Sequence, residues 1–261
     1  TTRYADAKKL LTLAKKATGT LYIRQNRRFE DGFMHIRRII ASGILGEIQE
    51  IKLRRHSFNF RGDWQTLKRY GGGQLLNWGP HIIDHALQFL GGKFKSVWSD
   101  LRIVTAVGDA EDHVKLLITG PTGLTVDLEI SGGAAIGETT YHIFGTRGAL
   151  RSGDDFIQLK YLDPKAKLEI VKADPGTPGS DGHPPMPNHV LVKHGKAKQD
   201  NDIKWIEKDF PIDPAPTDIW KELHAAVRRG KEFPIKVEDI VEAMRLVEEA
   251  RNASSFYRSR K

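Results

Sequence analysis

The stretch from residue 94 to residue 172 constrains the fold more than any other part of the sequence. It contains six runs with strand-like alternation, separated by turn signals such as Pro121-Thr122-Gly123 and Gly132-Gly133. The expected strands are Phe94–Val107, His113–Thr119, Leu124–Ser131, Thr139–Phe144, Phe156–Leu162 and Lys167–Lys172. Because short turns join antiparallel strands, pairing between neighbours in the chain is the simplest topology. We therefore expect an α+β protein with a large, open, mostly antiparallel sheet.

Apolar periodicity predicts the remaining elements. Helices are expected at Ala5–Lys16, Gly32–Ser42, Pro80–Leu90, from Thr217-Asp218 onward, and at Val237–Tyr257. Further strands are expected at Thr20–Phe29, Glu47–Phe58 and Ile203–Phe210. Helices on one face of the sheet are the economical arrangement. The proline- and glycine-rich segment 174–202 is predicted to be a lid, an interaction arm or a disordered insertion.

Composition excludes several classes of site. The chain has 261 residues and no cysteine, so disulfides, thiolate nucleophiles and cysteine-containing zinc sites are ruled out. No run approaches the ~18 consecutive apolar residues of a membrane-spanning helix, and we expect no membrane partner. The net charge of +8 is concentrated at the start, because residues 1–70 hold 16 basic and 6 acidic residues. Runs such as Arg54-Arg55-His56 are compatible with a nucleic-acid surface, a solvated face or a site for a phosphorylated ligand.

The residues most suggestive of chemistry follow Gly71-Gly72-Gly73. On the helix expected after them, His81, Asp84, His85 and Gln88 fall on one face. Three interpretations are open for this face. It is an ordinary solvated helix surface, a metal site built on His81 and His85, or a place for general acid/base catalysis by His81. A position in the first turn favours the neutral form of His81, which is able to accept a proton.

Four segments together resemble the Gfo/Idh/MocA family of oxidoreductases. They are the run from Gly71 to His85, Asn26-Arg27-Arg28-Phe29, Ala41 to Ile48, and Gly145-Thr146-Arg147-Gly148, and their order and spacing extend over essentially the whole chain. The resemblance implies a Rossmann domain that binds NAD or NADP, followed by a substrate domain with a large open sheet. It also implies hydride transfer to or from a sugar- or cyclitol-like alcohol or ketone.

The resemblance assigns roles to five residues. His81 matches the histidine that exchanges the proton of the substrate hydroxyl, and Asp84 matches a carboxylate that holds substrate hydroxyls. Asn77 stands where many members have aspartate, so it is able to orient a substrate but not to carry a proton. Arg27 corresponds to a residue near the junction of cofactor and substrate. Trp64 is a weaker candidate for packing on a sugar face, with core packing as its more ordinary role.

Two family signatures are absent from the sequence. Neither Gly-x-Gly-x-x-Gly nor a Glu-Lys-Pro tripeptide, which supplies the family's catalytic lysine, occurs here. The first predicted helix and strand also lack a preceding strand. We therefore expect residues 1–30 to be the last helix and strand of a Rossmann domain and residues 31–261 to be the substrate domain. On this view no complete cofactor site lies in the chain, and the chain alone is inactive.

Three classes of function compete at this point. The first is an NAD(P)-dependent oxidoreductase to which this chain contributes the substrate domain. The second is a non-catalytic carbohydrate-binding or assembly module on the same fold, and the third is nucleic-acid binding, which we do not expect. A small carbohydrate-like molecule and a homo-oligomer formed through the open sheet are the expected partners. No metal is expected. The cytoplasm is the favoured compartment, with an export signal in an upstream segment as the alternative.

Overall fold

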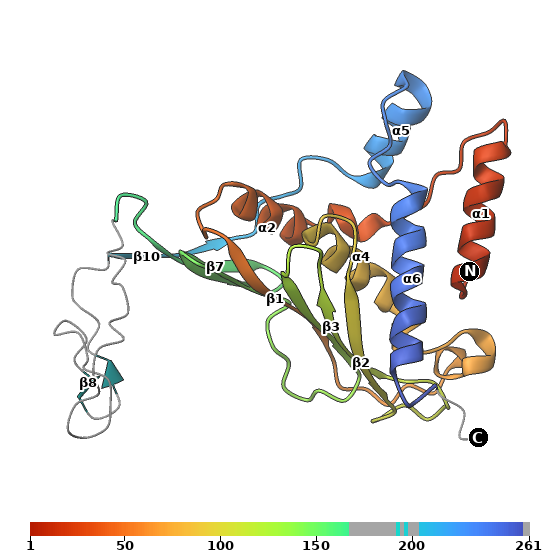
Figure 1. The fold of residues 1–261 in the computed structure, drawn as a ribbon, viewed down its shortest axis with the longest axis horizontal. Coiled ribbons are helices and arrows are strands. Elements are labelled where there is room, and N and C mark those ends of the chain that lie inside the picture. Colours follow the sequence, from red (N-terminus) through yellow and green to blue (C-terminus); the bar gives the residue numbers. More distant parts are fainter. Residues whose placement is uncertain (167–191, 194–195, 198–203, 258–261) are drawn as a thin grey trace, which may run out of the picture.

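The computed structural model describes residues 1–166, 192–193, 196–197 and 204–257. A sheet of eight strands forms its centre, and a separate pair of short strands lies apart from it (Figure 1). The strands of the large sheet are β1 (Ile48–His56), β2 (Ser96–Arg102), β3 (His113–Thr119), β4 (Thr125–Ser131), β5 (Tyr141–Gly145), β6 (Gly148–Ser152), β7 (Phe156–Leu162) and β10 (Trp205–Pro211). The small pair is β8 (Val192–Lys193) and β9 (Lys196–Ala197).

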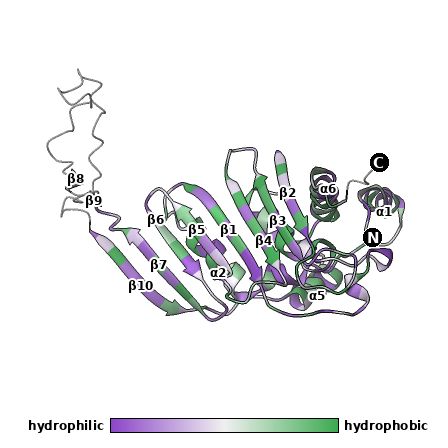
Figure 2. Cartoon of the chain, turned by 90° about the horizontal axis from the view of Figure 1, so that it is seen from below, coloured by the Kyte–Doolittle hydropathy of each residue, from purple (hydrophilic) through white to green (hydrophobic). Residues whose placement is uncertain are grey.

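The strand order of the large sheet is β10-β7-β6-β5-β1-β4-β3-β2, as Figure 2 shows from below. All neighbours are antiparallel except β1 and β4, which are parallel and pair Leu53 with Leu128. The expected open, mostly antiparallel sheet is therefore confirmed. Pairing only between neighbours in the chain is not, because β1 lies between β4 and β5. Parallel partners need a long crossover connection, which here runs through the helices between residues 56 and 125.

The helices are α1 (Tyr4–Lys16), α2 (Asp31–Ala41), α3 (Gln74–Asn77), α4 (Gly79–Phe89), α5 (Ile219–Arg229) and α6 (Val237–Ala253). Helices α2, α4 and α6 lie over the same face of the sheet, and α1 lies outside α6 (Figure 1). Alternate residues of each strand point to these helices, so that Leu116 and Leu128 are fully buried partners. None of the helices in the described ranges is long and apolar enough to cross a membrane.

Local sequence signals account for several helix ends. Asp218 caps α5 by accepting bonds from the backbone N–H groups of Trp220 and Lys221, each at 2.9 Å. The same helix ends at Gly230, which has a φ of 65°. Pro80 occupies the first turn of α4, where its missing N–H costs nothing. These signals are the ones on which the sequence-based boundaries rest, and the predicted helices are confirmed to within a few residues.

Two strand predictions were wrong. Residues 20–25 pair with no strand in the part of the chain that the structure describes, and Asn26–Phe29 form a short 3-10 helix. A strand needs a neighbour to accept its backbone hydrogen bonds, and this segment binds α4 through side chains instead. Conversely, β6 was missed because Leu150 is its one large apolar residue. The predicted strand Lys167–Lys172 lies outside the described residues, as does most of segment 174–202.

The first thirty residues contact the rest of the molecule at several points. Helix α1 packs on α6, and the backbone oxygen of Thr2 accepts a bond from Arg251 at 3.3 Å. Leu10 and Leu13 of α1 nevertheless expose 48% and 63% of their surface, so the helix buries little of its apolar face in this chain. The proposed domain boundary near residue 30 stays a prediction.

Candidate active site

The glycine run ahead of α4 makes a close backbone packing possible. A Cβ on Gly72 would lie 2.4 Å from the backbone oxygen of Gln65, and a Cβ on Gly73 would lie 2.3 Å from Oε1 of Glu111. Gly73 also has a φ of 105°, a conformation that other residues rarely adopt. Glu111 is itself buried, and it accepts a bond from the backbone N–H of Leu75 at 3.1 Å. The glycines thus place the start of α3 directly against Glu111 and Gln65.

Residues 25–28 bind the polar face of α4. Gln25 donates from Nε2 to the backbone oxygen of Pro80 at 2.7 Å, and its Oε1 lies 3.1 Å from Nδ1 of His81. Arg28 makes a two-point contact with Asp84 in which both N···O distances are 2.7 Å. The polar face is therefore an internal interface and not the ordinary solvated helix surface that sequence alone left open.

His81 is the titratable group on this face that keeps partial exposure, and the amide of Gln88 is also partly exposed. Burial lowers its pKa, and the positive charges of Arg27 and Arg24 lower it further, because each of these effects disfavours the imidazolium. The ring is therefore neutral at pH 7. A neutral, partly exposed imidazole held by a hydrogen bond is the arrangement that general-base catalysis requires.

Asp84 and His85 are almost completely buried, each with 1% of its surface exposed. Both carboxylate oxygens of Asp84 accept hydrogen bonds from Arg28. The resemblance assigned these oxygens to substrate hydroxyls, but here they bind Arg28. Burial raises the pKa of Asp84, and the bonds from Arg28 oppose that shift. Arg28 also pairs with Asp239 of α6 at 2.9 Å. The pair thereby joins the segment 25–28 to two helices.

His85 has a partner at each ring nitrogen. Its Nε2 lies 2.9 Å from the backbone oxygen of Arg27, and its Nδ1 lies 3.1 Å from the hydroxyl of Tyr141. Burial lowers its pKa to about 3, so the ring is neutral. Both nitrogens are used within the protein, which leaves neither for a metal shared with His81. Among the residues that the structure describes, no group of three or more His, Asp or Glu side chains is placed to hold a metal ion.

Of the other predicted site residues, Arg27 belongs to this interface through its backbone oxygen, and Asn77 and Trp64 have other surroundings. Asn77 donates from Nδ2 to Oε1 of Gln65 at 2.5 Å and is half-buried. Trp64 exposes 57% of its surface, so core packing, the more ordinary role considered for it, was wrong. Arg27 pairs with Glu30, and its guanidinium carbon lies 4.1 Å from the ring centre of Trp78.

A pocket lies next to α4, and Trp78 is one of its lining residues, whereas His81 is not. Trp78 forms one wall, and its ring centre lies 6.3 Å from that of His81. Arg55, from the end of β1, is 4.0 Å from the same tryptophan ring. The remaining lining combines apolar groups with carboxylates and a hydroxyl, contributed by Glu30, Asp31, Phe33, Ile82, Thr140, Tyr141 and Asp154 among others. An aromatic wall with charged and hydroxyl groups around it is typical of a site for a small polar ligand.

Four residues around His81 and the pocket were not predicted from the sequence: Gln25, Arg55, Trp78 and Tyr141. Gln25 had no local signal, Arg55 was noted only as part of a basic run, and Trp78 only as part of the run from Gly71 to His85. Tyr141 had one usable signal, since an aromatic residue at the start of a strand often carries its hydroxyl to a polar partner. Its partner His85 lies 56 residues away in the sequence, and no local pattern predicts that contact.

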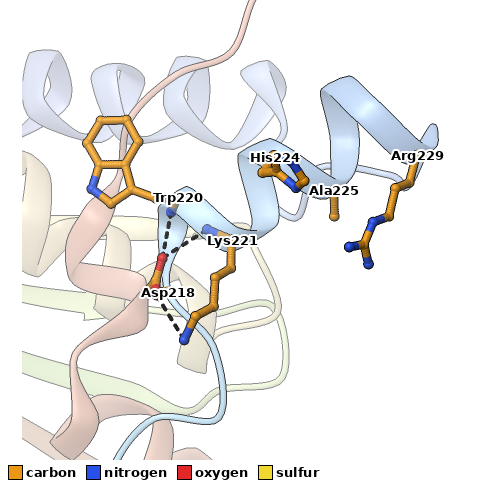
Figure 3. A pocket seen from close by; sticks show the side chains of 6 residues that line it. All are labelled: Asp218, Trp220, Lys221, His224, Ala225 and Arg229. Carbon is orange, nitrogen blue, oxygen red and sulfur yellow. Dashed lines mark hydrogen bonds and ion pairs between the residues drawn. The ribbon is translucent and has the colours of Figure 1, made fainter.

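A second hollow lies along α5 (Figure 3), and Trp220, which lines it, has its ring centre 5.5 Å from the guanidinium carbon of Arg24. It is lined by Asp218, Trp220, Lys221, His224, Ala225 and Arg229. Lys221 forms an ion pair with Asp218, with 3.3 Å between Nζ and Oδ2. None of the residues singled out from the sequence lies here, and the candidate active site remains His81 with the pocket that Trp78 lines.

Comparison with known proteins supports the resemblance. Residues 33–151 match the family model described as the GFO/IDH/MocA C-terminal domain. This segment, a little under half of the chain, is similar to the Gfo/Idh/MocA family. An uncharacterized oxidoreductase of Schizosaccharomyces pombe is 26% identical over 97% of this chain and 70% of its own length. The scyllo-inositol 2-dehydrogenase (NADP(+)) IolW of Bacillus subtilis is 22% identical over 92% of this chain and 63% of its own length.

Solved structures share the fold of this chain. An NAD-binding protein from Listeria innocua superposes with a TM-score of 0.73 at 20% identity, covering 97% of this chain and 70% of its own. The UDP-N-acetylglucosamine 3-dehydrogenase GnnA from Acidithiobacillus ferrooxidans superposes with a TM-score of 0.66 at 15% identity, covering 100% and 70%. The predicted resemblance and fold class are thus confirmed. The relatives carry the names of oxidoreductases and dehydrogenases, and the Gfo/Idh/MocA family uses NAD(P).

The sequence signature of a dinucleotide site is absent, and the expectation that this chain holds no complete cofactor site stays a prediction. Its sequence contains no Gly-x-Gly-x-x-Gly run. The run Gly71-Gly72-Gly73 is packed against Gln65 and Glu111, so its backbone is not open to a phosphate. Relatives such as the S. pombe protein extend beyond the match, which covers 70% of their length.

Proposed function

We propose that this chain supplies the substrate side of an NAD(P)-dependent oxidoreductase that acts on a sugar- or cyclitol-like alcohol or ketone. The observation that carries the proposal is His81, a neutral imidazole held by Gln25. Its ring centre lies 6.3 Å from that of Trp78, which lines the polar pocket. The names of two similar proteins, an inositol dehydrogenase and a nucleotide-sugar dehydrogenase, support the substrate class. In this proposal the dinucleotide is held by a segment that corresponds to the part of the relatives outside the match.

The proposed step transfers one proton to this chain. In the oxidation, the hydroxyl proton passes to His81, the C–O bond becomes a carbonyl, and the hydrogen on the carbinol carbon leaves with its electron pair. NAD(P)+ is the acceptor of that hydride. A depressed pKa suits His81 to the oxidative direction, because the free enzyme then holds the base form over a wide pH range. In the reverse reduction the imidazolium returns the proton to the oxygen.

The other residues assist this proton transfer. Arg27 and Trp78 form a stacked wall for the substrate, with Arg55 beside them. Asn77 is fixed by Gln65, and its remaining polar atoms are available to orient a hydroxyl. Trp64 is exposed in the loop ahead of Asn77 and is the residue we propose to close over a bound ring. Asp84 acts indirectly, through its ion pair with Arg28.

The central test is His81→Ala in a form of the protein extended at its N-terminus to the full length of its relatives. We expect turnover to fall by about 100- to 10,000-fold. His224→Ala, on α5 outside the site, is the matched control and should leave turnover unchanged. An unaltered rate in His81→Ala would remove His81 from the mechanism.

A binding measurement tests whether the dinucleotide is held by a segment other than this chain. Titration calorimetry with NADH and NADPH should detect no tight binding to the chain as given and binding of one of them to the extended form. The same titrations identify the preferred dinucleotide. Tight binding by the chain alone would contradict the proposal that another segment holds the cofactor.

One observation favours a second candidate, a carbohydrate-binding or assembly module without catalysis. Position 77 holds an amide, not a carboxylate, and this amide donates its hydrogen bond to Gln65. The two functions differ in a direct assay with a panel of inositols and sugars. Dinucleotide reduction by the extended protein supports the enzyme, whereas ligand binding without reduction supports the module.

We also propose that two copies associate through the open face of the sheet. Trp98 on β2 and Leu117 on β3 are register partners there, with 54% and 40% of their surfaces exposed. Light scattering after size exclusion should give the mass of a dimer or a larger oligomer. A Trp98→Glu variant should shift that mass toward the monomer, and a monomeric wild type would contradict the interface.

A further inference from the structure

Gln25 has an unusual position for a residue in a basic segment. It is 5% exposed, and its side chain bridges the first turn of α4, with Pro80 on one side and His81 on the other. The bond to Pro80 fixes which end of the amide faces which partner. A backbone carbonyl only accepts, so the amide nitrogen of Gln25 must point to Pro80 and its oxygen to His81.

The orientation of that amide determines where the ring of His81 carries its proton. The amide oxygen of Gln25 is only an acceptor, and it lies 3.1 Å from Nδ1 of His81. Nδ1 must therefore donate. In a neutral imidazole one nitrogen donates and the other accepts, which leaves the Nε2 lone pair of His81 free. Among the described residues, no hydrogen-bond partner is found for Nε2.

We propose that Gln25 is a positioning residue that locks His81 in the Nδ1–H tautomer and so presents the Nε2 lone pair to the substrate hydroxyl. The inference rests on the proposed function, in which His81 carries the proton. It explains how the imidazole is oriented in a chain that has Asn77, an amide already bonded to Gln65, near the same helix start. The locking group is uncharged, so it orients the ring without favouring the imidazolium, as a carboxylate would.

The charges around His81 act in the same direction. Arg27 and Arg24 are the charged groups that lower its pKa, and His85, packed one turn further along α4, is itself neutral. A positive surrounding and a neutral acceptor at Nδ1 together keep the ring unprotonated. Replacing the acceptor by a carboxylate would place a negative charge next to the ring and reverse part of this effect.

The tautomer is measurable without any turnover. In the chain labelled with 15N-histidine, long-range proton–nitrogen correlation spectra distinguish a protonated from an unprotonated ring nitrogen, and loss of signals in His81→Asn assigns the resonances. We expect wild-type His81 to have a protonated Nδ1 and a bare Nε2 at pH 7. A wild-type ring with its proton on Nε2 would overturn the inference before any change of Gln25.

Two substitutions then test the role of Gln25. Gln25→Met keeps the size of the side chain and removes the acceptor, so the His81 signals should move to those of a mixture of tautomers. Gln25→Glu should raise the pKa of His81 by about 1 unit. Gln158→Met, at a glutamine on the sheet strand β7, is the matched control and should change neither. Unchanged His81 signals in a folded Gln25→Met would also overturn the inference.

Kinetics separate this inference from the proposed function. In the extended protein, Gln25→Met should lower kcat by roughly 10- to 100-fold with little change of KM, because only the fraction of rings in the correct tautomer reacts. A correct tautomer together with full activity in His81→Ala would refute the proposed function and leave the assignment standing. A wrong tautomer together with a large effect of His81→Ala would refute the role of Gln25 alone.

Discussion

Two buried arginine–aspartate pairs, one on each side of the sheet, have the same shortest N···O distance and different surroundings. Arg28 and Asp84 meet at 2.7 Å on the helix side, where their side chains are 6% and 1% exposed. Arg54 and Asp127 meet at 2.7 Å on the open face, where the exposures are 5% and 13%. The first pair joins a loop segment to α4, and the second joins the parallel strands β1 and β4.

The difference lies in how many other charges support each pair. Asp127 also binds Lys115 at 2.7 Å, Lys115 binds Glu129 at 2.9 Å, and Arg54 reaches Glu138 at 3.2 Å. Asp84 has Arg28 as its ion-pair partner among the described residues. A network on a sheet whose strands are already paired by backbone hydrogen bonds is redundant. The single pair at α4 holds the segment that carries Gln25, so it links stability to the site.

The largest difference between the two pairs is expected from neutralising each aspartate. Asp84→Asn leaves Arg28 buried with Asp239 alone, and we expect a loss of about 3–5 kcal/mol in the free energy of unfolding. Asp127→Asn leaves the other members of its network in place, and we expect a loss of about 1–3 kcal/mol. Urea unfolding of both variants measures the difference directly.

The effect on turnover should also differ between the two aspartate variants. In the extended protein, Asp84→Asn should lose activity in excess of its unfolded fraction, because the segment 25–28 no longer holds Gln25 against His81. Asp127→Asn should retain full activity wherever it is folded. Equal losses of activity in the two variants would show that the helix-side pair has no special connection with the site.

Low pH should lower the stability of the folded protein through His85, which lies on the face of the sheet that the helices cover. Its pKa is about 3 in the folded protein and about 6.5 in an unfolded chain, so the unfolded state binds more protons between these values. The stability is therefore complete above pH 6.5 and is lost as the pH falls toward 3. Between pH 7 and pH 5 the loss from this group is about 2 kcal/mol.

His85→Gln removes the titration and keeps a polar side chain at the position. We expect the unfolding free energy of this variant to depend less on pH than that of the wild type by the same ~2 kcal/mol. His142 on β5, whose pKa is also lowered by burial and by Lys52 and Arg151, is the open-face control. A wild type that is as stable at pH 5 as at pH 7 would contradict the neutral, buried state of His85.

The elements of this fold were predictable because their signals are local. Alternation identified β3 and β4, whose buried residues Leu116 and Leu128 lie in register, and helical periodicity with Pro80 at its start identified α4. The parallel pairing of β1 with β4 was not predictable, because it is decided by contacts between residues some seventy positions apart. No local period encodes a pairing of that kind.

The same distinction applies to the site. His81 was identifiable from the motif around it, but its partner Gln25 is 56 residues away, as are the partners in the pairs Arg28–Asp84 and Tyr141–His85. The sequence therefore indicated which helix carries the chemistry and left open what that helix faces. The three titratable residues of α4 looked alike in the sequence, and burial separates them: His81 is partly exposed, whereas Asp84 and His85 are almost completely buried.

A smaller effect is expected from the hydroxyl of Tyr141. It is 3.1 Å from Nδ1 of His85, and because His85 donates from Nε2 to the carbonyl of Arg27, its Nδ1 accepts the tyrosine proton. Tyr141→Phe leaves that buried acceptor unpaired and should cost about 1 kcal/mol or somewhat more. Thermal unfolding followed by circular dichroism detects a loss of this size. An unchanged melting temperature would mean that water replaces the hydroxyl.

The smallest effect is expected from an ion pair on the open face that is exposed to solvent. Lys160 and Glu207 join β7 to β10 with 2.5 Å between Nζ and Oε1, but their side chains are 51% and 65% exposed. Water and salt screen such a pair, and holding two long side chains in place costs entropy, so Lys160→Ala should change the unfolding free energy by less than about 1 kcal/mol. The change should vanish in 1 M salt, where the screening length is ~3 Å. A loss as large as that of Asp127→Asn would show that the open face depends on ion pairs along its whole width, and the contrast between a redundant network and a single anchoring pair would no longer hold.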